Sequence, residues 1–190
     1  MKNWVTNLNR KSAKQTDTIK MKIQYFHIFS LVLFMVFTGV FVGGNSGKTD
    51  DYFCVEPEYI DHGLLLQLVN DIRQQGCNCG DDYFAATTPV TWNNALEQAS
   101  LAHCDDMHEN NFFSHVSSNG SNLGDRVKKS GYIWSVCGEN IGKGYIGEED
   151  VVSGWLSSPG HCKNLMNPVF KEMGVARNGE YWTQVFATQY

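Results

Sequence analysis

A single apolar run, residues 26–42, divides this chain of 190 residues into two unequal parts. Lys20 and Lys22 precede the run, and the small-residue string GGNSG (43–47) follows it. A basic start, an apolar core and a small-residue end are typical of a secretory signal peptide. We therefore predict cleavage near Gly44, with Met21 as an alternative start. An uncleaved N-terminal membrane anchor is the other interpretation, because the run is only slightly shorter than a membrane span.

The part that follows the run is acidic and long enough for one domain with its own core. From Asn45 onward nine Lys and Arg residues stand against nineteen Asp and Glu residues, a net charge of −10. Nucleic-acid binding needs clustered basic side chains that neutralise phosphates, so this class of partner is excluded. The sequence predicts three segments: an extension with signal peptide or anchor (1–44), a linker (45–59) and one domain (60–190).

All six cysteines lie beyond the predicted cleavage point. They are Cys54, Cys77, Cys79, Cys104, Cys137 and Cys162. An even number of cysteines in an exported chain predicts disulfide bonds, and six cysteines allow fifteen pairings. Our working hypothesis joins Cys162 to one member of the Cys77/Cys79 pair and Cys104 to Cys137, and leaves Cys54 for the remaining partner. A structural zinc site is the weaker alternative, because no second cysteine pair has zinc-finger spacing.

Apolar residues recur with helical spacing in four segments. The predicted helices run from Leu64 to Gly76, from Asn93 or Asn94 to about Asn111, from Leu123 to Lys129, and from Glu148 to Leu156. Asparagine supplies a side-chain cap for the second helix. The Ser-Pro-Gly string after the fourth helix is interpreted as a turn.

Strand patterns are concentrated near the C-terminal end. Residues 173–178 and 181–188 flank Gly179-Glu180 and predict an antiparallel hairpin, and residues 138–145 predict one more short strand. A small antiparallel sheet with helices packed on both faces follows from these elements. The predicted fold class is therefore α+β.

Three short blocks carry the most specific motifs: FSH (113–115), CGEN (137–140) and SPGHCKNLMNP (158–168). Together with the first two helices and the final hairpin, these blocks resemble the CAP superfamily of cysteine-rich secretory, antigen 5 and pathogenesis-related 1 proteins, which share the SCP domain. The resemblance covers about residues 60 to 190. It implies a three-layer α-β-α sandwich with a surface cleft into which His115, Glu139 and His161 point.

Two imidazoles and a carboxylate in one cleft can hold a divalent metal such as zinc, or bind a ligand without metal. Better-known members of the superfamily carry a second Glu three residues after the position of Trp155. Here that residue is Ser158, and the WLSSPGH string resembles the bacterial branch; Asp125 is a candidate substitute for the missing carboxylate. We predict an extracellular binding module for a small apolar ligand such as a lipid, a peptide or a divalent metal.

Two alternatives stay open: a metal-dependent hydrolase that uses Glu139 as base or ligand, and an envelope scaffold with a vestigial cleft. No residue is assigned a catalytic role, although His115, Glu139 and His161 are candidates. The three side chains can also serve only to fix irregular loops, since buried polar groups need partners. His103 lies on an apolar helix face and is interpreted as a core-edge residue, and His108 as solvent-facing. No serine lies in a G-x-S-x-G motif, so a serine nucleophile is not predicted.

Overall fold

The computed structural model describes residues 60–190. The predicted signal peptide or anchor, the linker and Cys54 lie outside these residues. Within residues 60–190 no helix has both the length and the apolar character needed to cross a membrane.

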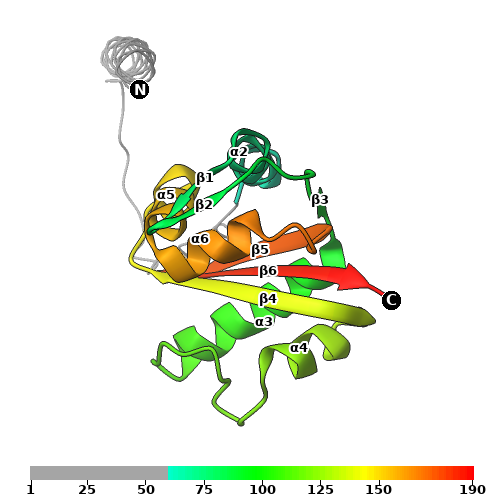
Figure 1. Ribbon diagram of the computed structural model, residues 1–190. Helices are drawn as coiled ribbons and strands as arrows, with labels where there is room; N and C mark the ends of the chain where they lie inside the picture. The colour runs from blue at the N-terminus through cyan, green and yellow to red at the C-terminus, as the bar shows by residue number, and fades with distance from the viewer. Residues whose placement is uncertain (1–59) are drawn as a thin grey trace, which may run out of the picture. The chain divides into compact units, whose positions relative to one another are not determined.

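Helices cover both faces of a four-stranded sheet. The helices are α2 (His62–Gln75), α3 (Asn94–Glu109), α4 (Leu123–Lys129), α5 (Glu148–Ser157) and α6 (Pro159–Met166). The strands are β1 (Cys77–Cys79), β2 (Asp82–Phe84), β3 (Thr91–Trp92), β4 (Trp134–Lys143), β5 (Glu172–Asn178) and β6 (Tyr181–Gln189). Helices α3 and α4 lie on one side of the sheet, and α2, α5 and α6 lie on the other (Figure 1). The predicted three-layer α-β-α sandwich is confirmed.

The main sheet has the order β3-β5-β6-β4. Strands β5 and β6 form the predicted antiparallel hairpin, and β4 pairs antiparallel with β6. The two-residue strand β3 pairs parallel with β5 and is the exception to the predicted antiparallel sheet. Strands β1 and β2 form a separate hairpin. Segments as short as β1, β2 and β3 carry too few residues for an alternating pattern, which explains why the sequence did not reveal them.

Strand β6 supplies the centre of two hydrophobic cores. Its side chains alternate between the faces of the sheet, as in any β-strand. Trp182 and Phe186 pack on the side of α2, α5 and α6, whereas Val185 and Ala187 pack on the side of α3 and α4. All four side chains are buried, so β6 contributes to both interfaces between the sheet and its helices.

A buried arginine joins helix α2 to the end of α6. Helix α2 starts where the Asp61 carboxylate accepts a hydrogen bond from the Leu64 amide, and it ends before Gly76. On its inner face the Arg73 guanidinium donates to the carbonyl oxygens of Leu165, at 2.7 Å, and Asn167, at 3.1 Å, as well as to those of Thr88 and Phe170. These four carbonyl groups lie in the last turn of α6 or in loops, where no backbone amide of a helix or strand is available to them. Buried carbonyl groups need hydrogen-bond donors, and Arg73 supplies them. Arg73 therefore fixes the chain after α6.

Helix α3 packs closely on the sheet because β5 contains a glycine opposite it. Asn93 caps α3 as predicted, with its side-chain oxygen accepting from the amides of Ala95 and Leu96. A Cβ atom placed on Gly174 would lie only 2.1 Å from the backbone nitrogen of Glu97. Glycine is thus required at this position for α3 to approach the strand.

Helix α4 has the predicted bounds, whereas α6 was missed. The predicted turn at Ser158-Pro159-Gly160 is wrong, because Pro159 occupies the first turn of α6. Proline is favoured there, since its fixed φ suits a helix and the amide it lacks would have had no partner within the helix. The helix places His161 beside the edge strand β4 and Cys162 against the β1–β2 hairpin.

The disulfide hypothesis is half confirmed. Cys162 is bonded to Cys79, whereas Cys77, Cys104 and Cys137 are free thiols in the structure. The predicted Cys104–Cys137 bond is wrong. Cys104 contacts Thr183 of β6, and Cys137 pairs with Ala187 of the same strand. Four residues of a strand span about 13 Å, far beyond the Cα separation of about 7 Å that a disulfide tolerates.

We expect Gly174→Ala to lower the free energy of unfolding by about 3 kcal/mol or more, because the added methyl group forces α3 away from β5. Gly160→Ala is the matched control, since a Cβ atom at Gly160 meets no atom within 4 Å. Chemical denaturation followed by circular dichroism measures both variants. Equal stabilities of the two variants would contradict the proposed close approach.

Candidate functional site

Glu139 lies at the centre of a charged cluster on the edge strand β4. Its side chain is only 3% exposed. Oε2 accepts a hydrogen bond of 2.6 Å from Nη2 of Arg126, and Oε1 lies 2.8 Å from Nδ1 of His115. The fold thus brings the side chains of His115 and Glu139 together, as the family resemblance implied. Both carboxylate oxygens are engaged by protein groups.

The edge position of β4 explains how the two helical layers reach one site. Glu139 points toward α3 and α4, while its neighbour Asn140 points toward α6, because successive side chains of a strand face opposite sides. Asn140 donates to the carbonyl oxygen of His161, and Asn164 of α6 donates to the carbonyl oxygen of Glu139. No strand lies beyond β4 in the described sheet, so side chains from both helical layers can approach this edge. His161 comes from one layer and His115 from the loop on the other side.

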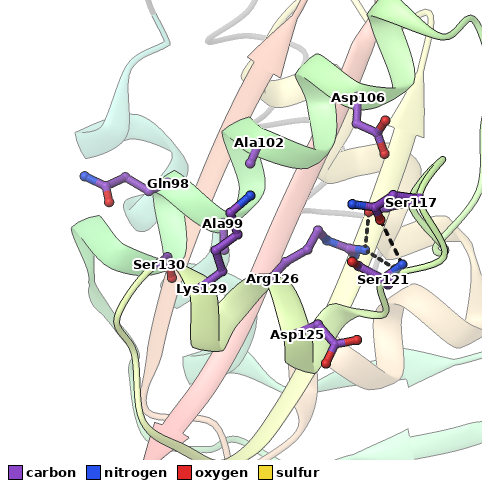
Figure 2. A pocket seen from close by; sticks show the side chains of 11 residues that line it. Gln98, Ala99, Ala102, Asp106, Ser117, Ser121, Asp125, Arg126, Lys129 and Ser130 are labelled. Atoms are coloured by element: carbon purple, nitrogen blue, oxygen red, sulfur yellow. Dashed lines mark hydrogen bonds between the residues drawn. The ribbon is translucent and has the colours of Figure 1, made fainter.

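Arg126 of helix α4 ties Glu139 to the loop that carries His115. Its Nη1 donates to the carbonyl oxygen of His115 and to the hydroxyl of Ser117, both at 3.1 Å, and the carbonyl of Ser121 lies at 3.4 Å. Figure 2 shows this guanidinium between the two serines. Nε of Arg126 is the buried side-chain polar atom that has no partner among the described residues.

The role of Arg126 was missed in the sequence, yet a signal for it exists. In the predicted helix 123–129, Leu123, Arg126 and Val127 have the spacing i, i+3, i+4 that places side chains on one face. Arginine on the apolar face of a short helix indicates a buried charge that needs a partner.

His103 lies behind Glu139 and is fully buried. Its Nε2 is 2.8 Å from the carbonyl oxygen of Ser114 and 4.0 Å from Oε1 of Glu139, and the Ser117 hydroxyl lies 3.5 Å from Nδ1. Burial lowers the pKa of His103, an effect that the charge of Glu139 partly offsets. A neutral ring that donates from Nε2 to a carbonyl fits this environment. The interpretation as a core residue holds, although His103 also supports the cluster.

His161 is half-buried at the start of α6. Burial is the main cause that lowers its pKa, and the charge of His115 adds to the effect. Its ring nitrogens have no hydrogen-bond partner within residues 60–190, and the same is true of Nε2 of His115. Two imidazole rings, those of His115 and His161, therefore have nitrogen atoms available to a ligand.

Asp125 takes another role than the predicted one. Its carboxylate accepts from the Asn122 amide, and its own amide donates to the Asn122 side chain, which together form a capping box. Asp125 also lines a cavity of about 390 Å³ between α3, α4 and the loop before α4. Figure 2 labels Asp125 and Arg126 on this cavity. None of His115, Glu139 and His161 lines it.

Other histidines and a serine of the domain have ordinary structural contacts. His108 is exposed, as predicted. His62 stacks on Trp92 with ring centroids 4.3 Å apart, and its Nε2 lies 3.1 Å from Glu97. The Ser114 hydroxyl accepts from the amide of Val116.

The metal-donor geometry differs between the cluster and the cysteines. Within the described residues, Cys77, Cys79 and Cys162 form the group of three donors that all lie within 4.8 Å of one another. His115, Glu139 and His161 do not form such a group. In the cluster, Glu139 orients His115 through Nδ1, the arrangement by which carboxylates position imidazole ligands.

The sequence profile of the cysteine-rich secretory protein family, CAP, matches residues 66–190. The chain belongs to this family. Relatives include two proteins of Bacillus subtilis, the uncharacterized membrane protein YlbC, 36% identical over 101 residues, and the uncharacterized protein YkwD, 37% identical over 100 residues. These matches cover 53% and 52% of this chain but only 29% and 39% of the relatives.

Solved structures agree with the CAP assignment. An extracellular protein with an SCP domain from Bacillus anthracis superposes with a TM-score of 0.60 at 30% identity, over 67% of this chain and 40% of that one. An outer surface protein of Borrelia burgdorferi has the same fold, with a TM-score of 0.58 at 20% identity, over 67% of this chain and 92% of that one. The solved structures that share the fold thus include an extracellular protein and an outer surface protein of bacteria.

We expect the Arg126–Glu139 pair to show strong energetic coupling. Arg126→Leu or Glu139→Leu alone leaves a buried charge without its partner, which costs about 3–5 kcal/mol of folding free energy. The double variant removes both charges and loses less than the sum of the two. A double-mutant cycle by urea denaturation measures this coupling. Additive losses would show that the two side chains do not depend on each other.

We also expect the CAP domain to lose stability in acid, below about pH 6.5. His103 and His161 have pKa values lowered by burial, so the unfolded chain takes up protons more readily than the folded one. The free energy of unfolding therefore stays constant above the usual imidazole pKa of about 6.5 and falls as the pH drops below it. Urea denaturation at pH 7.5 and pH 5 tests this. A His103→Gln variant with unchanged pH dependence would remove His103 from the explanation.

Proposed function

We propose that this protein is an exported binding module of the CAP family, and that His115 and His161 contact its ligand. The observation that carries the proposal is the construction of His115. Its ring is 55% exposed, yet Nδ1 is held by a carboxylate that is itself buried and paired with Arg126. Burying an ion pair brings little net stability. A costly pair that orients an exposed ring supports a role in binding.

Apolar side chains beside His115 support a ligand with an apolar part. Phe113 is 48% exposed and Val116 is 51% exposed, on either side of the histidine in the chain. Exposed apolar side chains that adjoin a fixed polar group are typical of sites for peptides and small apolar ligands. Glu139 has a positioning role in this proposal, and no catalytic residue is assigned.

A metal-dependent hydrolase is the second candidate, and the carboxylate–imidazole pair is the observation that favours it. Such a pair leaves Nε2 of His115 directed away from Glu139, where it can bind zinc together with His161. Both carboxylate oxygens of Glu139 already contact protein groups, which disfavours Glu139 as a direct zinc ligand. The positive charge of Arg126 also repels a cation close to this carboxylate. Two imidazoles alone bind zinc less tightly than the three ligands of a catalytic centre.

Zinc titration distinguishes these roles. We expect a dissociation constant that is micromolar at best for the parent protein, and loss of binding in His115→Ala and in His161→Ala. His108→Ala is the matched control, because it removes an exposed imidazole elsewhere on the surface. Affinity is expected to fall below about pH 6.5, where protons compete for the imidazoles. Stoichiometric zinc retained after dialysis, with hydrolysis of peptide substrates, would instead establish the hydrolase.

The binding module itself is tested with two probes, a C16 fatty acid and a library of unstructured peptides, both without metal. We expect at least one probe to bind, and binding to weaken about tenfold or more in a Phe113→Ser/Val116→Ser variant. A Val169→Ser variant is the control, since Val169 is an exposed apolar residue after α6. Equal binding by both variants would show that the probe does not bind at Phe113 and Val116. No binding of either probe would favour the scaffold with a vestigial cleft.

Export is tested on the full chain. We expect the secreted protein to begin near Asn45 and to migrate ahead of the uncleaved chain, because signal peptidase cuts after small residues. Recovery of the intact N-terminus in the membrane fraction would establish the anchor.

A further inference from the structure

Three sulfur atoms meet where the β1–β2 hairpin lies against α6. Cys79 and Cys162 form the disulfide, and the free Sγ of Cys77 lies 3.7 Å from Sγ of Cys162. All three sulfur atoms lie within 4.8 Å of one another. Cys79 and Cys162 are buried, whereas Cys77 is half-exposed.

The strand geometry places both cysteines of the C-x-C pair opposite one partner. Residues i and i+2 of a strand face the same side, so Cys77 and Cys79 both point toward α6. The side chain of Asn78 points to the opposite side of the strand, and its carbonyl oxygen lies 3.8 Å from Sγ of Cys162. Cys162 is therefore within reach of two alternative partners.

We propose that these residues form a thiol–disulfide exchange site, in which the bond to Cys162 moves between Cys79 and Cys77. The thiolate of Cys77 attacks Sγ of Cys162, a Cys77–Cys162 bond forms, and Cys79 leaves as the thiolate. One disulfide and one thiol are present before and after the step, so no external oxidant or reductant takes part. This inference is independent of the proposed function.

The transfer requires the side chain of Cys77 to rotate. Exchange proceeds through three sulfur atoms in line, but the 4.8 Å limit on their separation shows that they are bent in this structure. Burial also raises the pKa of Cys77, which keeps its thiolate fraction small at neutral pH. Exchange is therefore expected to take minutes to hours, the usual range for uncatalysed disulfide rearrangement.

The position of the bridge bears on the candidate site. Cys162 follows His161 in α6, and the turn of the β1–β2 hairpin contacts the first turn of the same helix, where Gly80 packs on Pro159. A bridge to Cys77 in place of Cys79 pulls on α6 from a point two residues away along β1. The exchange thus changes the tether of the helix turn that carries His161.

The full chain, purified without reductant, is incubated at pH 8, quenched in acid and alkylated. Electron-transfer fragmentation of the linked peptides then locates the alkyl group. We expect two populations, one alkylated on Cys77 and one on Cys79. The same two populations in a Cys54→Ser background would assign the exchange to these three sulfur atoms. Alkylation confined to Cys77 after a day would overturn the proposal.

Single variants give a second measurement. Cys79→Ser is expected to form a Cys77–Cys162 bond, and Cys77→Ser to retain the Cys79–Cys162 bond. Cys104→Ser is the control, because its buried thiol contacts Ala176 and Thr183 far from this hairpin. A Cys79→Ser protein that is folded by circular dichroism but has a free Cys162 would also overturn the proposal.

Discussion

The ion pair between Arg126 and Glu139 is the interaction on which the candidate site depends. It joins helix α4 to the edge strand β4, and through the other guanidinium nitrogen it holds the loop that carries His115. A charge buried without a partner would be expelled or neutralised. The pair therefore fixes the position of the carboxylate, and that carboxylate in turn orients the ring of His115.

The opposite helical layer is held by different chemistry. Arg73 donates to four backbone carbonyls around the end of α6, and the disulfide to Cys162 holds the start of the same helix. His161 directly precedes the disulfide-bonded Cys162 in this helix. The two histidines of the site thus belong to separately stabilised layers, and they approach each other at the β4 edge of the sheet.

Most of the fold was predictable from the sequence because its signals are local. The Asn93 cap, the helical stripe before Gly76 and the hairpin at Gly179-Glu180 all act over a few residues. Helix α6 was missed because Ser-Pro-Gly fits a turn as well as a helix start. The partners of Glu139 required knowledge of which face of β4 meets α4, and the Cys104 error arose because sequence reasoning has no measure of distance along β6. The pairing of His115 with Glu139 came from family resemblance alone.

The order of strands in the sheet also sets the order in which the domain can be completed. The strand at its centre, β6, is the last of the described elements, and it supplies side chains to both cores. Until residues 181–189 emerge during synthesis, β4 and β5 have no strand between them and neither helical layer has a finished surface to cover. The four-stranded sheet and both hydrophobic cores can therefore be completed only after this strand is available.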